Sequence, residues 1–214
     1  MTGPINTVLI DWGGTITIPM RDAFSPLLDR HGLDVTSVLA AFGTAADPLG
    51  APPDDLLVRA ETGQISDDDF ETEIEARAPG LFDVLDPTSP PSLFDAADRP
   101  EMIALLEACN AAEVFVLIAT NNLRVAHDTL ARRYLESGLV QGIANSALMG
   151  VRKPDPNFFE LCLEAAGAEP ETTLFLDDRP DNIEAAQALG IHGVLVDDDP
   201  LPAVATARRL LGFS

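Results

Sequence analysis

Residues 7–15 read TVLIDWGGT: a short apolar run ends at a carboxylate, Asp11, and a pair of glycines follows closely. Three further runs end at a polar residue in the same way: 114–119 (VFVLIA) before Thr120, 173–176 (TLFL) before Asp177, and 193–196 (GVLV) before Asp197. Hydrophobicity that is continuous rather than alternating indicates strands buried on both faces. Residues 7–15 and their three counterparts therefore predict a parallel sheet.

Amphipathic stretches that separate these runs predict the crossover helices of such a sheet, at residues 102–109, 124–135, 157–166 and 183–189. The expected fold is therefore α/β, with a Rossmann-like parallel sheet. Ligands of such sheets bind beyond the carboxyl ends of the strands, which is where the polar residues that end the apolar runs would gather.

The interval from Thr17 to Pro100 does not continue this alternation of strand and helix patterns. Helical patterns occur there at residues 23–30, 35–41, 54–61 and 67–77, with no convincing strand, and prolines cluster at residues 52–53 and 87–91. We predict two domains: an α/β core made of residues 1–16 and 101–214, and a small helical cap made of residues 17–100.

Composition excludes several classes of protein. The chain has 214 residues with 13 basic and 35 acidic side chains, a formal charge of −22, so it lacks the basic face that nucleic acids and anionic membranes require. No apolar run reaches the ~18 residues of a membrane span. The first 16 residues show no cleavage site, and Cys109 and Cys162 are expected as buried thiols. These features predict a cytoplasmic protein and carry no signal for its oligomeric state.

Four groups of residues at the predicted strand ends are suited to phosphate chemistry. Asp11 could act as a nucleophile or a metal ligand, and the glycines after it allow backbone N–H groups to approach a ligand. Thr120-Asn121 offers a hydroxyl and an amide, and Asp177-Asp178 offers two adjacent carboxylates suited to Mg²⁺. Taken singly, each group is equally well explained as a helix cap or a turn.

Lys153 completes the set. It is the single lysine in a chain with 12 arginines. A lysine kept in that setting indicates a position that needs a compact ammonium rather than a forked guanidinium.

In combination, these residues resemble the four motifs of the haloacid dehalogenase-like hydrolase superfamily, over essentially the whole chain. The motifs are Asp11-Trp12-Gly13-Gly14-Thr15, Thr120-Asn121, Lys153-Pro154, and Asp177-Asp178 with Asn182. Residues 61–66 (ETGQIS) followed by Phe70 are similar to the cap of the phosphatase branch that includes the epoxide hydrolase N-terminal domain.

The resemblance implies a phosphatase of a small phosphorylated metabolite. Asp11 would form an aspartyl-phosphate, and Mg²⁺ would be held by Asp11, the carbonyl of Gly13, Asp177 and Asp178. Lys153 would neutralise charge, and the phosphate would also be bound by Gly14, Thr120 and the Asn121 backbone.

One position departs from the pattern. Most phosphatases of this family have a second Asp two residues after the nucleophile as general acid and base, and here that residue is Gly13. Such a group contributes ~10²- to 10⁴-fold to the rate. The sequence offers no clear replacement, since His31, His127 and His192 are scattered and suit surface or packing positions.

The departure leaves alternatives open. The chain could be a weak or inactive member that binds a phosphorylated ligand or a protein partner, or, as a minor alternative, a dehalogenase that attacks carbon without metal. A phosphonoacetaldehyde hydrolase is disfavoured, because that chemistry needs a cap lysine and the insertion has none. A metal-dependent phosphatase remains the main prediction.

Overall fold

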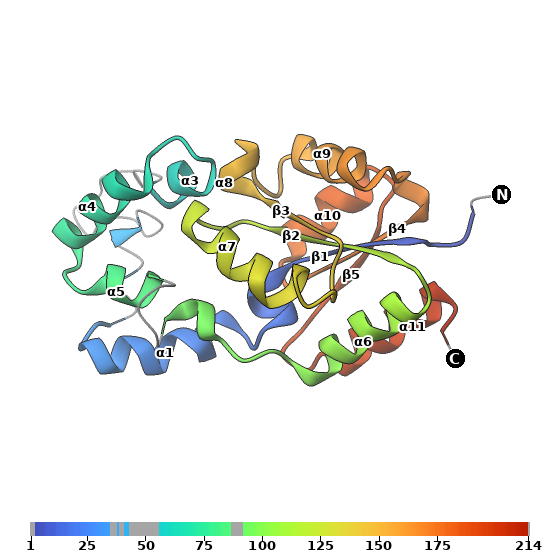
Figure 1. Cartoon of the computed structure of the whole chain (residues 1–214), viewed down its shortest axis with the longest axis horizontal. Coiled ribbons are helices and arrows are strands. Elements are labelled where there is room, and N and C mark those ends of the chain that lie inside the picture. Colours follow the sequence, from blue (N-terminus) through green and yellow to red (C-terminus); the bar gives the residue numbers. More distant parts are fainter. Residues whose placement is uncertain (1–2, 35–37, 39–40, 43–55, 87–91, 214) are drawn as a thin grey trace.

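A five-stranded parallel sheet lies at the centre of the protein, in the order β3-β2-β1-β4-β5 (Figure 1). The computed structural model describes residues 3–34, 38, 41–42, 56–86 and 92–213. The strands are β1 (Thr7–Ile10), β2 (Phe115–Thr120), β3 (Gly142–Asn145), β4 (Thr173–Asp177) and β5 (His192–Leu195). The predicted α/β fold with a Rossmann-like parallel sheet is confirmed.

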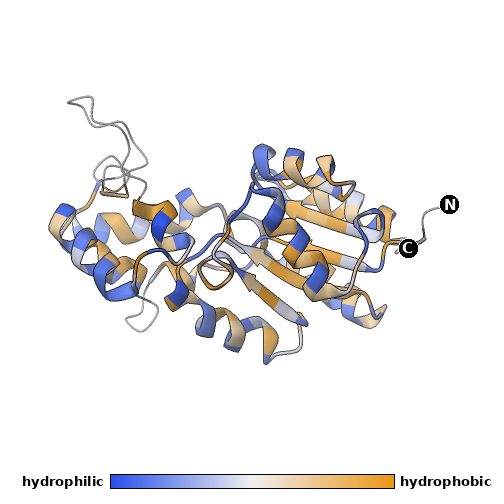
Figure 2. Ribbon diagram, turned by 90° about the horizontal axis from the view of Figure 1, so that it is seen from above, coloured by the Kyte–Doolittle hydropathy of each residue, from blue (hydrophilic) through white to orange (hydrophobic). Residues whose placement is uncertain are grey.

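Helices cover both faces of the sheet, which is why the central strands are apolar throughout. Val8 and Ile10 of β1 pack in one core cluster, while Leu9 between them packs in another on the opposite face. The first cluster takes its helical residues from α6 (Pro100–Ala111), α7 (His127–Leu130) and α11 (Leu201–Leu211), and the second from α9 (Pro156–Ala166) and α10 (Pro180–Ala188). Figure 2 shows the apolar strands between these helices.

The four predicted strands are present, displaced by at most one residue. Strand β3 is not predicted by the sequence patterns, because it is a short edge strand that reads GIAN and is only partly buried. The predicted helix at 124–135 is divided into η3 (Arg124–Ala126), α7 and η4 (Ala131–Leu135). Helix α11 is a further element that the sequence patterns do not predict.

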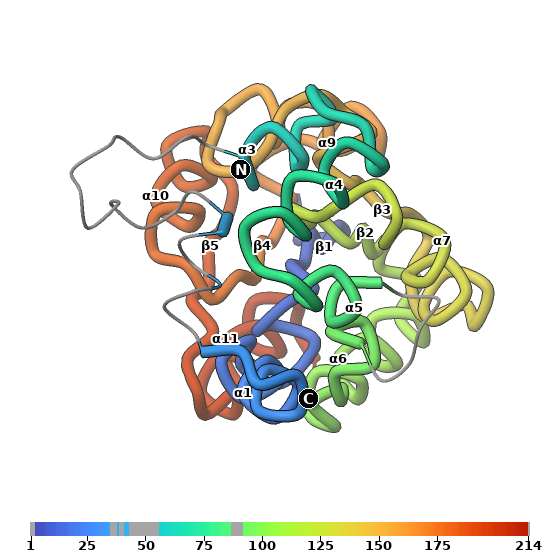
Figure 3. Tube along the Cα trace, turned by 90° about the vertical axis from the view of Figure 1, so that its left-hand side faces the viewer, coloured from blue at the N-terminus to red at the C-terminus, as the bar shows by residue number. Residues whose placement is uncertain are grey.

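The insertion after β1 is helical in its described part and forms a core of its own. It contains α1 (Met20–His31), α3 (Leu56–Glu61), α4 (Asp67–Arg77), α5 (Leu81–Leu85) and the short η2 (Leu93–Asp95). Leu56, Ile74, Leu81 and Val84 are fully buried in this cluster. Figure 3 shows α3, α4 and α5 in front of the strands. The proline clusters and most of the helix expected at 35–41 lie outside the described residues.

The two ends of the insertion lie side by side. Thr17 and Asp98 form an isolated antiparallel bridge. The Ile18 N–H donates to the Ala97 carbonyl at 2.9 Å, and the Arg99 N–H donates to the Ile16 carbonyl at 2.8 Å. The chain therefore leaves and rejoins the sheet region at neighbouring points, at the carboxyl end of β1.

Among the helices that the structure describes, none has both the length and the apolar composition that crossing a membrane requires.

Candidate active site

Asp11, Lys153 and Asp177 meet at the carboxyl ends of β1 and β4. The Lys153 Nζ lies 2.8 Å from Asp11 Oδ1 and 2.6 Å from Asp177 Oδ2. The lysine side chain is 1% exposed, and its ammonium lies 5.5 Å from the centre of the Phe175 ring. A compact ammonium fits between the two carboxylates, whereas the longer, forked guanidinium of arginine would need more room. This geometry explains why a lysine stands here in an arginine-rich chain.

Asn121 holds the main chain of Lys153 through two reciprocal hydrogen bonds. The Asn121 Nδ2 donates to the Lys153 carbonyl, and the Lys153 N–H donates to Asn121 Oδ1, both at 2.9 Å. The side chain of Asn121 is therefore committed to positioning Lys153. Its backbone, directly after β2, remains the part predicted to contact a phosphate, next to the buried Thr120.

The two adjacent carboxylates at the end of β4 have different environments. Asp177 is fully buried and accepts hydrogen bonds from the Arg179 N–H at 2.8 Å, from Asn182 Nδ2 at 2.9 and 3.1 Å, and from Lys153. Asp178 is half-buried and lines the cavity described below. Of the two, Asp178 is thus the better candidate for a direct metal ligand, while Asp177 is placed to orient Lys153.

The loop after Asp11 depends on two glycines with different surroundings. Gly14 has φ +81°, and a Cβ there would collide with the Asp178 carboxylate. Gly13 has an ordinary φ of −74°, and a Cβ would lie 2.9 Å from the sulfur of Met20. The Gly14 N–H donates to Thr17 Oγ1 at 3.1 Å, so this predicted phosphate donor already has a partner within the loop.

The charge balance of the site is suited to a divalent cation. Asp11, Asp177 and Asp178 each offer a carboxylate oxygen, and these oxygens lie within 4.8 Å of one another. Lys153 supplies one positive charge against these three acids. Hard oxygen donors in this number are the ligands that Mg²⁺ prefers. Asp11 and Asp178 therefore fit the predicted Mg²⁺ as direct ligands, Asp177 adds its charge beside them, and the carbonyl of Gly13 remains a predicted further ligand.

Burial and like charge shift the pKa values of the site. Burial, with smaller contributions from Asp177 and Asp178, raises the pKa of Asp11 to about 7 against the lowering effect of Lys153. Burial, together with Asp177, also raises the pKa of Asp178. Burial alone would lower the pKa of Lys153, but Asp11 and Asp177 outweigh it and the net pKa is raised. The lysine is therefore charged at neutral pH.

A cavity of about 380 Å³ opens onto these residues, with Asp11, Thr120, Lys153 and Asp178 on one side. The remaining lining is largely apolar and comes mainly from the insertion: Phe24, Phe42, Leu57, Leu85, Leu93, Phe94 and, from the loop after β2, Leu123. The cavity thus has a charged floor and an apolar wall.

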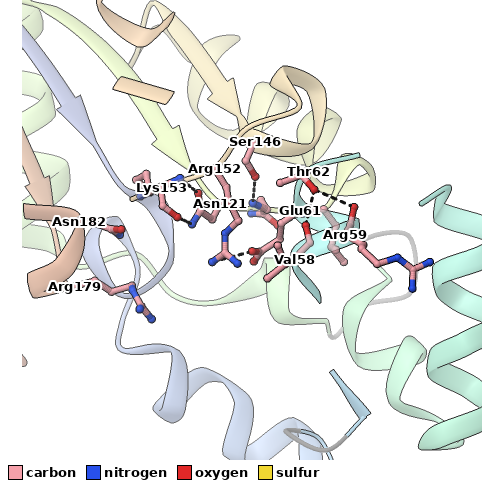
Figure 4. A network of polar contacts seen from close by, with 12 residues as sticks. Val58, Arg59, Glu61, Thr62, Asn121, Ser146, Arg152, Lys153, Arg179 and Asn182 are labelled. Carbon is pink, nitrogen blue, oxygen red and sulfur yellow. Dashed lines mark hydrogen bonds and ion pairs between the residues drawn. The ribbon is translucent and has the colours of Figure 1, made fainter. Parts of the chain in front are cut away.

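A partly buried ion pair also lines this cavity. The Arg152 Nη2 lies 3.2 Å from Glu61 Oε2, and the two side chains approach one another in Figure 4. Apart from this ion pair, the buried Glu61 Oε2 and Arg152 Nε have no hydrogen-bond partner in the described part of the chain. Burial raises the pKa of Glu61, although Arg152, Lys153 and Arg179 oppose this effect.

A model of the haloacid dehalogenase-like hydrolases matches residues 5–190. The chain belongs to that family. The match spans both the sheet and the insertion, so the predicted membership is confirmed.

Two curated relatives of this hydrolase-family chain match over parts of their length. Residues of the chain are 44% identical over 71 positions to mouse acyl-CoA dehydrogenase family member 10, covering 33% of this chain and 6% of that protein. They are 39% identical over 83 positions to the sesquiterpene phosphatase astK of Aspergillus oryzae, covering 39% of this chain and 42% of that protein. The chain therefore spans less than half of each of these relatives.

A solved structure shares the fold of the family over nearly the whole chain. It is a HAD family enzyme of Bacteroides thetaiotaomicron in complex with magnesium and inorganic phosphate, with a TM-score of 0.65 and 20% identity. The alignment covers 91% of this chain and 96% of that one. At this identity the likeness establishes the shared fold.

Within this HAD-like hydrolase, the cavity residues differ in how well the sequence signals them. The four motifs are brought together at one edge of the sheet. Met20 and Glu61 are missed as site residues, although residues 61–66 were part of the cap resemblance. Two cations of the insertion, Arg21 and Arg59, do not line the cavity that contains Asp11. Arg59 points away from Lys153 in Figure 4 and lies 3.7 Å from Glu73.

Proposed function

We propose that the protein is a Mg²⁺-dependent phosphatase that hydrolyses a small phosphate monoester through an aspartyl-phosphate on Asp11. The observation that carries the proposal is the placement of Asp11 within 2.8 Å of the Lys153 ammonium and beside Asp178, on the floor of a cavity. This arrangement pairs a nucleophilic carboxylate with the positive charge that a phosphoryl group needs.

The chain's own residues suffice to describe the first step. The Asp11 carboxylate attacks phosphorus, and the bond to the ester oxygen breaks. Lys153 lies against the attacking oxygen and neutralises charge that develops on the phosphoryl oxygens. Thr120 and the Asn121 backbone hold the phosphate from the end of β2. A bound Mg²⁺, held by Asp11 and Asp178, would supply Lewis-acid stabilisation of the same charge.

The body of the substrate is proposed to be apolar. Seven side chains of the cavity wall are hydrocarbon, whereas the charged residues Glu61 and Arg152 face one another. Arg179, the remaining cation of the wall, is bound to Asp181 at 2.8 Å. The wall therefore offers dispersion and burial to an alkyl or aryl group rather than partners for a sugar's hydroxyls. That one relative is named a sesquiterpene phosphatase agrees with this substrate class.

The division into a core (residues 1–16 and 101–214) and a cap (residues 17–100) is part of the proposal. The separate apolar cluster of the insertion and the Thr17–Asp98 bridge at its neck support it. The cap residues on the cavity wall would then select the substrate and exclude water from the reacting atoms.

The test is a phosphatase screen with Mg²⁺ and with a chelator, run beside Asp11→Asn. We expect metal-dependent turnover that Asp11→Asn abolishes. Along a series of n-alkyl phosphates, kcat/KM should rise about fourfold per methylene until the cavity is full, because each buried methylene contributes ~0.8 kcal/mol. Sugar phosphates of similar size should be poorer substrates. If kcat/KM does not change along the alkyl series, the apolar substrate class is refuted and the phosphatase function still stands.

The absence of a side chain at Gly13 favours a second candidate, a weak or inactive member that binds a phosphorylated ligand. The same screen separates the two functions. Mg²⁺-dependent binding of inorganic phosphate without turnover of any ester would support the binding protein and refute the phosphatase. Release of chloride from a 2-chloro acid with no added metal would instead support dehalogenase chemistry.

A further inference from the structure

Gly13 leaves the site without the general acid that a phosphatase of this type needs at that position. The space beside Gly13 is filled by the thioether of Met20, whose sulfur lies 2.9 Å from where a Cβ would be. A thioether cannot donate a proton. If the protein is a phosphatase, a proton donor must reach the leaving oxygen from elsewhere.

The cavity wall contains three carboxylates within the part of the chain that the structure describes: Asp11, Asp178 and Glu61. Asp11 is the proposed nucleophile and Asp178 belongs to the acidic cluster that fits Mg²⁺. Glu61 is the carboxylate that the first step leaves unused.

The backbone of the insertion at Gly63 lies close to the backbone at Ala147, and this contact places Glu61 at the active site. Gly63 has φ +65°, and a Cβ there would collide with the Ala147 carbonyl of α8 (Ser146–Met149). A side chain at position 63 would therefore force the end of α3 away from the sheet domain. With glycine there, Glu61 comes within 3.2 Å of Arg152, the residue before Lys153.

The environment of Glu61 suits a group that alternates between an acid and a carboxylate. The residue is 9% exposed, and apart from the ion pair with Arg152, Oε2 has no hydrogen-bond partner among the described residues. Burial favours the neutral acid and raises the pKa, while Arg152, followed by Lys153 and Arg179, favours the carboxylate. A general acid and base requires access to both states near neutral pH.

We propose that Glu61 is the general acid and base of this site and takes the place of the side chain that Gly13 lacks. In the first step, Asp11 bonds to phosphorus, the ester P–O bond breaks, and the Glu61 carboxyl gives its proton to the leaving oxygen. In the second step, water attacks phosphorus and gives a proton to the Glu61 carboxylate, while the bond from phosphorus to Asp11 breaks. Inorganic phosphate leaves, and both side chains regain their starting states.

The inference rests on the proposed phosphatase function, so its test uses the dependence of rate on the leaving group. Wild type and Glu61→Gln are compared on aryl phosphates, from 2,4-dinitrophenyl phosphate to phenyl phosphate, with Mg²⁺. A dinitrophenolate leaves without a proton, whereas an alkoxide or a simple phenolate benefits from one. We expect Glu61→Gln to lose about 10²- to 10⁴-fold in kcat/KM on phenyl phosphate and less than about tenfold on 2,4-dinitrophenyl phosphate.

The second step gives an independent signature. Because Glu61 also accepts the proton of water, Glu61→Gln should release a burst of dinitrophenolate equal to the enzyme concentration and then turn over slowly. Glu73→Gln is the matched control, since Glu73 is a cap carboxylate bound to Arg77 at 2.9 Å and does not line the cavity. Its kcat/KM should equal that of wild type on every substrate.

An equal loss on all leaving groups, or no loss, would overturn the role of Glu61 while leaving the phosphatase function intact. If Glu61→Gln fails to fold, the rates of the wild type on the series of aryl phosphates still test the inference. A general acid predicts that kcat/KM depends weakly on the pKa of the leaving group, and a steep dependence would overturn the inference. A wild type that turns over none of these esters would overturn the phosphatase function itself.

Discussion

Replacing Lys153 with methionine should lower the free energy of unfolding by about 3–5 kcal/mol at pH 8, the range for removing one partner of a buried ion pair. The lysine side chain is 1% exposed, and its ammonium lies 2.8 Å from Asp11 and 2.6 Å from Asp177. Methionine keeps most of the volume of the stem, so the loss is mainly that of the charge. Both carboxylates then lose their closest cation.

The loss in free energy of unfolding of Lys153→Met relative to wild type, called the deficit below, should depend on pH in a defined direction. In the metal-free wild type, burial raises the pKa of Asp11 from its ordinary value of 3.8 to about 7, so the folded state binds the extra proton and gains stability as the pH falls through about 7. Without Lys153, the pKa of Asp11 rises further. The variant then takes up its proton at a higher pH, and its deficit relative to wild type shrinks between pH 8 and pH 6.

Urea unfolding at pH 8, 7 and 6, with and without Mg²⁺, measures this deficit. Arg179→Met is the control, because Arg179 forms an exposed ion pair with Asp181 at the same edge of the sheet and its loss should cost less than about 1 kcal/mol. A deficit below about 1 kcal/mol for Lys153→Met at pH 8 would contradict the reasoning, as would a deficit that does not change with pH.

Two further predictions concern the same edge of the sheet. Gly14→Ala should destabilise the protein by roughly 1–2 kcal/mol because of its φ of +81°, and it should lower Mg²⁺ affinity by displacing Asp178. Gly13→Ala should contact only the movable sulfur of Met20 and cost less than about 1 kcal/mol. Equal losses of stability for the two variants in calorimetry would refute this difference. Mg²⁺ affinity should fall about tenfold per pH unit below pH 7, because Mg²⁺ must displace a proton from Asp11. Titration calorimetry measures this affinity, and a constant value from pH 8 to 5.5 would exclude Asp11 as a ligand.

The sheet could be predicted from the sequence wherever its strands are buried on both faces. Strand β1 is fully buried, with alternate residues in two different core clusters, so its hydrophobicity is continuous and easily recognised. Strand β3 lies at an edge, carries a glycine and an asparagine, and leaves no comparable pattern. Edge strands bury too little surface to impose a strong pattern on their residues.

Three of the four motifs could also be predicted to meet, because Asp11, Thr120-Asn121 and Asp177-Asp178 each follow a predicted strand and parallel strands bring their carboxyl ends to one edge, whereas Lys153 follows α8 and was assigned to the site through the family resemblance. Which of those residues would bind a metal and which would position Lys153 could not be predicted. Asp177 and Asp178 are neighbours in the sequence, yet the hydrogen bonds from Asn182 and Lys153 to Asp177 make only the second a free candidate for a metal. Such differences arise from side-chain partners that adjacent positions do not share.

The parallel sheet could be predicted from the sequence, because strands buried on both faces leave continuous apolar runs, and the family and the cluster of Asp11, Lys153 and the two acids could be predicted from the resemblance of the motifs. What faces this cluster from the insertion could be seen only in the folded protein. The apolar wall and the Glu61–Arg152 pair depend on how the end of α3 meets the Ala147 carbonyl at Gly63. That contact joins distant parts of the chain, and no periodicity in either segment encodes it.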